Sequence, residues 1–380
     1  MRIAIVRTTL HRASGQTVHI RELALRLIRM GHEVTLFSRK TEGELGGISI
    51  ERVSFPLESV PFIRHFGFAA SCGVRVRDFD VVHTQYHPGI LAGNYLKRMR
   101  GVPHVFTYHG YAPVTVWRNP IQRIKMVDHR VGTFFALKLG ISQVITVSHY
   151  LRDELERFYG LDPTRIWVTY NGVDLRRFNP RVDGTVVREK YKVEDKPVIL
   201  YLGRLAFYKG PQYLIRAAPH VLREVPKAKF LIAGSARYDF PDLKDLAHRL
   251  GVSRSILFTG YVPNSELPGF YAACDVFCYP SLWEGFGLTP AEAQACGKPV
   301  VAFDHCAVPE VVSNGETGIL VSPRDHIALA KAIIDLLTDH EKRVEMGVKG
   351  EARVRKLFRW EKVAAKTAEV YERALERGRA

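Results

Sequence analysis

Short apolar runs alternate with amphipathic segments along the chain, and this alternation predicts the architecture before any single residue does. Runs rich in β-branched residues predict strands at 1–8, 32–38, 79–85, 103–110 and 142–148. Between the first two runs, apolar side chains recur at helical spacing and end in a glycine, which predicts a helix at 18–31. Strands that alternate with helices favour a parallel sheet with helices on both faces, so the expected fold class is α/β.

The pattern resets after a polar stretch, residues 171–197, which we interpret as a linker. Beyond it, apolar runs predict strands at 196–205, 228–235, 255–262, 275–281 and 298–304. A length of 380 residues also favours two cores over one. We therefore expect an N-terminal domain at 1–180, a C-terminal domain at 181–358 and a terminal helix within 359–380. Ligands are expected at the carboxyl ends of the strands and in a cleft between the domains.

Composition narrows the class of protein and its compartment. No run of 18 apolar residues occurs, so a membrane-spanning helix is not expected, and the first residues fit a strand better than a signal peptide. The five cysteines are few, odd in number and set among apolar residues, which is typical of reduced structural thiols in the cytoplasm. The formal net charge of +16 suits an anionic membrane, nucleic acid or a phosphorylated substrate, and does not choose between them.

Two cations follow the first strand of the second domain. Arg204 and Lys209 lie in LYLGRLAFYKGP, on a loop before a helix that Pro211 starts. A rigid guanidinium fork and a compact ammonium together suit two adjacent phosphates. Solvated loop cations are the alternative, but a position at the carboxyl end of a strand favours phosphate binding.

Two carboxylates flank a glycine-containing loop in SLWEGFGLTPAEAQACGKPVVA, residues 281–302. Residues 289–292 match a capping box with its threonine as the N-cap, so Glu292 has a structural interpretation, whereas Glu284 has none so clear. The loop glycines would let backbone amides approach a ligand, and the amides at the helix start could face phosphate. Carboxylates accept hydrogen bonds from sugar hydroxyls. This combination predicts a site for a nucleoside diphosphate sugar.

The loop after the first strand, TTLHRASGQTVH, contains neither a dinucleotide fingerprint nor a P-loop. Gly15 lies just before the predicted helix. Either it only turns the chain or it opens the helix N-terminus to an anion, and the residues leave both possibilities open.

Several segments in order along the chain resemble those of the retaining GT-B glycosyltransferases of family GT4. They are SGQTVHIRELALRLIRMGHEV, FTYHG, VSHYLRDEL, YNGVDLRRF, LGRLAFYKG, LWEGFGLTPAEAQACGKPVVA and NGETGILV. The resemblance covers nearly the whole chain, and the two glutamates around the G-x-G loop are its most specific part. It implies a GT-B fold: two Rossmann-like domains facing a central cleft, with the terminal helix crossing back to the first domain.

The resemblance implies an activity as well as a fold. A hexosyl group would move from a UDP- or GDP-sugar to a hydroxyl acceptor with retention of configuration. No cofactor is expected, and no metal, because cations replace it. Glu284 would contact the donor sugar, and Glu292 would bind the ribose hydroxyls. Arg204 and Lys209 would hold the diphosphate, and Gly15 would lie near the phosphates. The family usually has two adjacent glycines where this chain has serine before Gly15, which leaves the shape of that loop open.

His109, after the strand PHVFTYHG, would hydrogen-bond the donor sugar near the reacting carbon; a packed core histidine is the interpretation that its apolar surroundings alone would favour. Phe286, Gly287 and Leu288 would present backbone amides to sugar and phosphate. No carboxylate is clearly placed as a nucleophile, so the expected reaction is same-face attack in which the departing phosphate takes the acceptor's proton. The charge on the leaving group would be stabilised electrostatically.

The acceptor is less defined. Residues 62–77 mix aromatic and basic side chains, and four further cations surround a helix in the same half: Arg118, Arg123, Lys125 and Arg130. Basic amphipathic helices can lie on anionic lipid, while a half-buried helix with a solvated basic face is the ordinary alternative. We expect a lipid or glycan acceptor and a cytoplasmic enzyme, peripheral at the inner face of the membrane.

Other classes of protein remain as alternatives. The charge alone would suit a nucleic-acid-binding protein, but the cations are scattered and no nucleic-acid motif occurs, so nucleic acid is not expected as a partner. A sugar-nucleotide epimerase or a phosphorylase would keep the fold and change the reaction. The base of the donor is expected near residues 261–264, which give no clear readout of its identity.

Overall fold

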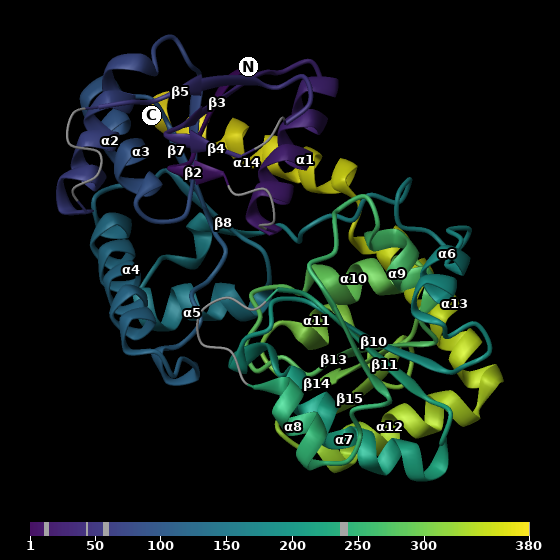
Figure 1. The fold of residues 1–380 in the computed structure, drawn as a ribbon. Coiled ribbons are helices and arrows are strands. Elements are labelled where there is room, and N and C mark those ends of the chain that lie inside the picture. Colours follow the sequence, from purple (N-terminus) through teal and green to yellow (C-terminus); the bar gives the residue numbers. More distant parts are fainter. Residues whose placement is uncertain (11–14, 43–44, 56–60, 236–241, 380) are drawn as a thin grey trace. The chain divides into compact units, whose positions relative to one another are not determined.

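The computed structural model describes residues 1–10, 15–42, 45–55, 61–235 and 242–379, with the side chains of 61–66 and 378–379 excepted (Figure 1). The chain forms two compact units. One comprises Met1–Tyr111, Lys125–Gly172 and Trp360–Ala380, and the other comprises Ala112–Ile124 and Val173–Arg359. Each unit has its own parallel sheet, which confirms the α/β class.

The first unit contains a seven-stranded parallel sheet in the order β5-β3-β1-β6-β7-β8-β9. Its strands are β1 (Arg2–Val6), β3 (Glu33–Ser38), β5 (Ser49–Arg52), β6 (Val81–Gln85), β7 (His104–Tyr108), β8 (Gln143–Thr146) and β9 (Ile166–Val168), with a separate pair β2 (Thr9–Leu10) and β4 (Lys40–Thr41). Its helices are α1 (Gly15–Arg29), α2 (Pro61–Arg75), α3 (Gly89–Arg100), α5 (His149–Tyr159), the 3-10 turn η2 (Pro163–Arg165) and α14 (Trp360–Arg379). The 3-10 turn η1 (Val114–Val116) precedes α4 (Pro120–Lys138), most of which belongs to this unit.

Alternate residues of β1 supply the two faces of this sheet, as a strand of period two requires. Ile3 and Ile5 join a core that α1 and α14 cover, whereas Ala4 and Val6 join a core that α2 and α3 cover. Helices α1 and α14 lie side by side, so the last helix of the chain completes the core that the first strand begins (Figure 1).

The second unit contains a six-stranded parallel sheet in the order β12-β11-β10-β13-β14-β15. Its strands are β10 (Val198–Leu202), β11 (Lys229–Ala233), β12 (Ile256–Gly260), β13 (Val276–Tyr279), β14 (Val300–Phe303) and β15 (Gly318–Val321). Its helices are α6 (Thr185–Tyr191), the 3-10 turn η3 (Phe207–Lys209), α7 (Pro211–Glu224), α8 (Leu243–Arg249), α9 (Leu267–Ala273), α10 (Leu288–Ala295), α11 (Val308–Val311), α12 (His326–Thr338) and α13 (His340–Leu357).

Strand order fixes where each unit can bind a ligand. In the first sheet β1 lies between β3 and β6, and in the second β10 lies between β11 and β13, so the order reverses beside the first strand in each case. Loops leave such a pair of strands in opposite directions, which opens a crevice outside their carboxyl ends. The residues after β1 and β6, and after β10 and β13, therefore form the candidate sites.

The expected linker at 171–197 is wrong in part. It contains α6, a short helix whose Val187 is buried although the rest of its sequence is mostly polar. The five cysteines are free, and four of them, Cys72, Cys274, Cys278 and Cys296, are buried, which agrees with structural thiols. Within the described residues no helix is long and apolar enough to cross a bilayer.

Candidate functional site

A buried ion pair lies at the crevice of the second unit. Lys209, in the turn after β10, pairs through Nζ with Oε1 of Glu284, which follows β13. The hydroxyl of Tyr279, the last residue of β13, donates to the same carboxylate oxygen. Lys209 is 9% exposed and Glu284 is 7% exposed. The two strands at the switch point thus bring a cation and an anion into contact although the sequence separates them by 75 positions.

The surroundings of the Tyr279 hydroxyl keep it protonated. Burial, and then the nearby charge of Glu284, raises the pKa of Tyr279 well above its ordinary value. The hydroxyl therefore stays protonated and remains a donor to the carboxylate. Since buried charges are tolerated only when paired and hydrogen-bonded, Tyr279 and Lys209 together keep an acidic group in the floor of the crevice.

Two cations share one aromatic surface beside the pair. The guanidinium carbon of Arg204 lies 5.7 Å from the ring centroid of Tyr208, and Nζ of Lys209 lies 5.1 Å from the same centroid. The hydroxyl of Tyr201 donates to the backbone oxygen of Arg204 at 2.8 Å and so holds the loop. The pKa of Arg204 is raised, first by Tyr208 and then by Glu284, so its charge is permanent. Its side chain is exposed and open to an anion.

The predicted capping box is wrong. Helix α10 begins at Leu288, its N-cap is Gly287 with φ +108°, and no side chain caps it. Glycine is favoured there because a left-handed conformation strains other residues, and the added Cβ would lie 3.1 Å from Cγ of Pro290. Thr289 is therefore inside the helix, and Glu292 lies too far along it to bond the first amides. In this first turn Pro290 has no N–H and that of Ala291 bonds to the oxygen of Gly287, so the backbone amides of Leu288 and Thr289 are the candidates for ligand contact.

Glu292 has a different partner from the one that the sequence suggested. It accepts a hydrogen bond from the hydroxyl of Tyr271 at 2.7 Å. Burial raises the pKa of Glu292 to about 7, and the bond from Tyr271 only partly offsets this. The carboxyl group is thus harder to ionise than that of an ordinary glutamate. Its neighbour in the predicted loop, Phe286, is buried and packs edge-on against Phe358 at 5.3 Å, so only its backbone is a candidate for ligand contact.

The crevice of the first unit is built around Arg7, the residue after β1. Its guanidinium donates to the backbone oxygen of Gln85 at 3.2 Å and to the side-chain oxygen of Gln16 at 2.6 Å. Gln85 ends β6 and Gln16 lies in the first turn of α1, directly after Gly15. A cation therefore joins the switch point to the helix N-terminus. The serine before Gly15 lies outside the described residues.

His109 belongs to this same crevice rather than to the core. It follows β7, is half-buried, and its Nε2 lies 2.9 Å from Oε1 of Gln85. Its ring meets that of His19 at 4.9 Å, edge to face, and Nδ1 of His19 lies 2.7 Å from Oδ1 of Asn171. Burial, followed by the charges of His19 and Arg7, lowers the pKa of His109 well below its ordinary value. Its imidazole is neutral at physiological pH and offers one donor and one acceptor.

The structure brings the candidate residues together within each unit. Arg204, Lys209 and Glu284 meet at the crevice of the second unit. Gly15 and His109 are linked in the first unit through Arg7 and Gln85. The roles of these residues toward a ligand stay predictions.

Sequence reasoning missed four residues that hold the two crevices: Tyr279, Tyr208, Arg7 and Gln85. Each ends a strand of the switch point or follows shortly after it. The general rule for ligand position in open sheets would have selected them, if every polar residue at those strand ends had been examined.

The expected acceptor region is only partly described. The side chains of residues 62–66 lie outside the described residues. Of the four further cations, three are held in place: Arg118 stacks 3.6 Å above the ring of Phe207, Arg123 donates to the backbone of Trp117, and Arg130 lies 3.3 Å from Glu154. Lys125 remains exposed. Three of the four cations thus have partners within the protein, and the lipid contact of this region stays a prediction.

One group of side chains could hold a metal ion. Potential ligand atoms of His87, Asp128 and His129 lie within 4.8 Å of one another in the first unit. Ligands of a tetrahedral zinc ion stand about 3.3 Å apart, since each zinc–nitrogen bond is about 2 Å long. Neither crevice contains such a group among the described residues.

Comparisons with known families divide the chain as the sheets do. Residues 13–177 match the family described as Glycosyltransferase Family 4, and residues 185–353 match Glycosyl transferases group 1. The two matches cover most of both units.

Curated relatives are similar over nearly their whole length. A protein of Xylanimonas cellulosilytica named D-inositol 3-phosphate glycosyltransferase is 33% identical over 96% of this chain and 93% of its own. An uncharacterized glycosyltransferase of Methanocaldococcus jannaschii is 29% identical over 95% of both chains.

Solved structures share the fold. Sucrose-phosphate synthase from Thermosynechococcus elongatus superposes with a TM-score of 0.80 at 25% identity, over 98% of both chains. HepE of Anabaena, solved in complex with UDP-glucose, gives a TM-score of 0.80 at 21% identity, over 97% of this chain and 98% of its own. The Rossmann-like pair of units is therefore the arrangement of elements found in GT-B proteins.

Proposed function

The chain belongs to the family 4 glycosyltransferases, retaining enzymes that transfer a sugar from a nucleotide sugar, and we propose that it moves a hexosyl group from a UDP-sugar to a hydroxyl acceptor without a metal ion. The observation that carries this proposal is the buried contact of Lys209 with Glu284 at the switch point of the second sheet. It sets a phosphate-binding cation and a hydroxyl-binding carboxylate side by side, as an activated sugar requires.

Arg204 and Lys209 neutralise the diphosphate in this mechanism. The ammonium of Lys209 has three donors and uses one on Glu284, so the others can reach a phosphate oxygen. Arg204, which is exposed and lies 5.7 Å from the ring centroid of buried Tyr208, adds a planar fork of donors. The first amides of α10 supply uncharged donors. As the bond to the sugar breaks, charge gathers on the departing phosphate and each of these groups stabilises it.

Glu284 and Glu292 orient the donor. The carboxylate of Glu284 accepts from a sugar hydroxyl, with Tyr279 fixing its position. Glu292 accepts from the ribose hydroxyls when it is ionised. His109, neutral and held by Gln85, hydrogen-bonds the sugar near the anomeric carbon. The acceptor attacks the face that the phosphate leaves, and the phosphate oxygen takes the acceptor's proton, which preserves the anomeric configuration.

We favour uridine because a solved neighbour, HepE of Anabaena, carries UDP-glucose. The relatives' name makes D-inositol 3-phosphate the first acceptor to examine. The test incubates the protein with UDP- and GDP-hexoses, with and without this acceptor, and measures nucleoside diphosphate release and the anomeric proton coupling of the product. An α-linked product from a UDP-sugar is expected. Neither release nor calorimetric binding with any donor would overturn the proposal.

A lipid acceptor at a membrane surface is a second proposal, carried by an apolar stripe on α4. Val127, Val131 and Phe135 lie at helical spacing on α4 and are 49%, 48% and 63% exposed, and Leu139, directly after the helix, is 56% exposed. Exposed Lys125 and Lys138 lie on the same helix. Apolar side chains next to cations are typical of helices that lie in an anionic bilayer surface.

Sedimentation with vesicles of phosphatidylglycerol tests the lipid proposal. The variant Val131→Glu/Phe135→Glu should lose binding. The control Val344→Glu/Val348→Glu changes two apolar residues of α13 that are 49% and 65% exposed, and it should bind like the wild type. Equal binding by both variants would refute this surface as the lipid contact.

A further inference from the structure

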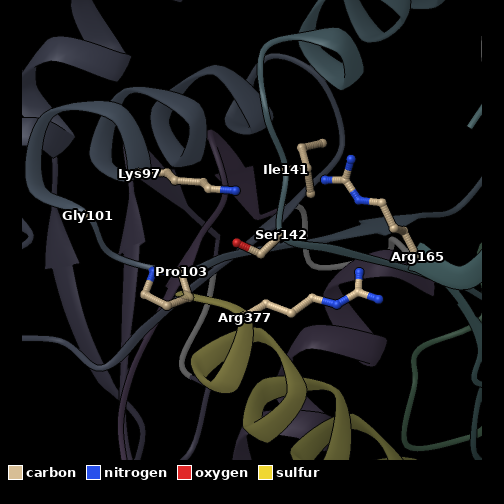
Figure 2. Close-up of a pocket in the computed structure, with 7 residues that line it drawn as sticks. All are labelled: Lys97, Gly101, Pro103, Ile141, Ser142, Arg165 and Arg377. Atoms are coloured by element: carbon tan, nitrogen blue, oxygen red, sulfur yellow. The ribbon is translucent and has the colours of Figure 1, made fainter. Parts of the chain in front are cut away.

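A basic pocket lies at the amino-terminal edge of the first sheet, the edge opposite His109. Its volume is about 320 Å³, and its lining residues are Lys97, Gly101, Pro103, Ile141, Ser142, Arg165 and Arg377 (Figure 2). Pro103 directly precedes β7 and Ser142 directly precedes β8. Because β7 is five residues long, the pocket and His109 are separated by about 16 Å of extended strand. The pocket is thus a separate place in the same unit.

Three cations from three different elements meet in this pocket. Lys97 lies near the end of α3, Arg165 ends η2 and Arg377 lies in the last turns of α14. Figure 2 shows Lys97 and Arg165 pointing toward each other across Ser142. No carboxylate lines the pocket.

The three positive charges of this pocket repel one another. Burial and then Arg165 lower the pKa of Lys97, and burial and then Arg377 lower the pKa of Arg165. The acid that acts on Arg165, Asp162, is exposed and hydrogen-bonds Thr164 at 2.9 Å. Across the described part of the chain, the side-chain nitrogens of Lys97, Arg165 and Arg377 have neither a hydrogen bond nor an ion pair. Folding therefore gathers three like charges here, and exposed Asp162 offsets those of Arg165 and Arg377 only through space.

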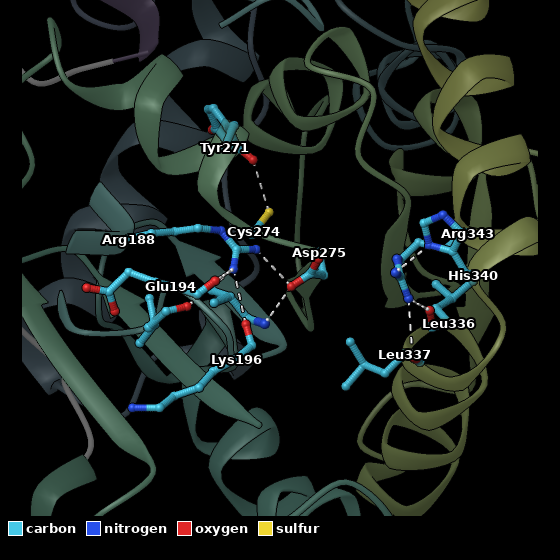
Figure 3. Close-up of polar contacts among 12 residues, drawn as sticks. Arg188, Glu194, Lys196, Tyr271, Cys274, Asp275, Leu336, Leu337, His340 and Arg343 are labelled. Carbon is cyan, nitrogen blue, oxygen red and sulfur yellow. Dashed lines mark hydrogen bonds and ion pairs between the residues drawn. The ribbon is translucent and has the colours of Figure 1, made fainter. Parts of the chain in front are cut away.

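A pocket at the amino-terminal edge of the second sheet provides a comparison, because its cations have partners within the protein. A pocket before β10 and β13 is lined by Arg188, Asp195, Lys196, Asp275 and Arg343, among others. There Arg188 lies 3.1 Å from Oδ2 of Asp275 and donates to the backbone oxygens of Glu194 and Lys196, as Figure 3 shows. Arg343 likewise donates to backbone oxygens of α12. These cations are satisfied by the protein itself, whereas those of the first unit are not.

We propose that the pocket of Lys97, Arg165 and Arg377 binds a phosphate-bearing ligand. A phosphate monoester or a pyrophosphate supplies two or more negative charges and several acceptor oxygens, which match an ammonium and two guanidinium groups. The volume falls at the lower end of the range for small-molecule sites, so a phosphorylated small molecule or a lipid phosphate group fits better than a protein segment. A bound anion would also tie the last turns of α14 to the sheet, because Arg377 would share it with Arg165.

Inorganic pyrophosphate is the probe, and its binding is measured by isothermal titration calorimetry. The variant Arg165→Gln/Arg377→Gln removes two charges from the pocket. The control Arg98→Gln/Lys366→Gln removes two exposed charges outside the pocket, one from α3, which carries Lys97, and one from α14, which carries Arg377. Any binding of pyrophosphate near Arg204 and Lys209 is common to both variants, so their difference reports the pocket alone. Thermal melts without ligand should show the pocket variant at least as stable as the control, since repulsion is removed.

The wild type and the control should bind pyrophosphate in the pocket, and the pocket variant should bind there at least about tenfold more weakly. A second arm measures sedimentation with phosphatidylcholine vesicles that contain phosphatidic acid. Loss of vesicle binding in the pocket variant alone, with pyrophosphate competing in the wild type, assigns a lipid phosphate as the ligand. A difference in calorimetry without one in sedimentation assigns a soluble phosphate compound. Identical behaviour of the two variants in both arms overturns the proposal.

Discussion

The pair of Lys209 and Glu284 predicts a large, non-additive effect on stability. The substitutions are Lys209→Met, Glu284→Gln and both together, chosen because they keep side-chain volume while removing charge. Each single change leaves one charge in a site whose side chains are only 11% and 9% exposed. The double change removes both charges, and the hydroxyl of Tyr279 can then donate to the neutral amide oxygen that replaces the carboxylate.

Breaking a buried ion pair by removing one partner costs about 3–5 kcal/mol. Tyr279 still donates to Glu284 when Lys209 is replaced, and the amide oxygen in Glu284→Gln can still accept from Lys209, so we take the low end, about 3 kcal/mol, for each single variant. For a domain of 150–250 residues this corresponds to a fall in Tm of about 6–12 °C. The double variant should lose only about 1 kcal/mol, because replacing a whole buried pair by neutral groups is often nearly neutral.

Differential scanning calorimetry measures the three melting transitions. A surface pair, Lys342 and Asp335, is the matched control: its side chains are 39% and 43% exposed, and Lys342→Met/Asp335→Asn should cost no more than about 1 kcal/mol. The reasoning is refuted if the two single variants at the buried pair behave like the surface control, or if their effects simply add in the double variant.

Further predictions concern one residue each. Since only the ionised carboxylate of Glu292 accepts both ribose hydroxyls, the KM for the donor should fall as pH rises through about 7; Glu292→Gln should remove this dependence, and a dependence that survives in the variant would count against the assignment. The raised pKa also means that Glu292 favours the folded state in its protonated form, so this group's contribution to stability should weaken as pH rises from about 4.5 to about 7 in calorimetry. His109→Ala should lower kcat/KM by about tenfold, because one hydrogen bond to the sugar is lost, with circular dichroism unchanged; full activity would return His109 to a packing role. Gly210→Ala should lower the Tm far more than Gly251→Ala: both glycines have positive φ, +76° and +69°, but only at Gly210 would the new Cβ lie 1.8 Å from the oxygen of Pro280, and equal losses would contradict this.

The sequence predicts the architecture well because both units follow one rule throughout. Buried parallel strands read as continuous apolar runs, and the helices between them show one apolar face, so β10 and β13 are recognisable without a structure. Helix α6 could not be predicted in this way. It is short and buries a single valine, so its sequence shows no apolar face and its stability depends on packing against neighbouring elements.

Part of the candidate site could be predicted from the sequence. Arg204, Lys209 and Glu284 stand out as charged residues where a strand ends, and the rule for open sheets places them at the crevice. The contact between Lys209 and Glu284 could not be predicted, since it depends on which strands are neighbours, and β10 and β13 are separated by two strands in the sequence. The capping box at 289–292 fails because Gly287 starts α10 earlier than a side-chain cap would, a backbone choice that composition does not reveal.

Helix α14 makes the first unit discontinuous in a way that matters during synthesis. Trp360, Ala364 and Tyr371 are fully buried in a core that also contains Ile3 and Ile5, so this core lacks one wall until the residues from 360 onward have left the ribosome. The second unit needs little from outside Val173–Arg359 and can close earlier. The half of the protein that is translated first is therefore the last to mature, and its unfinished apolar surface is where a chaperone would be needed.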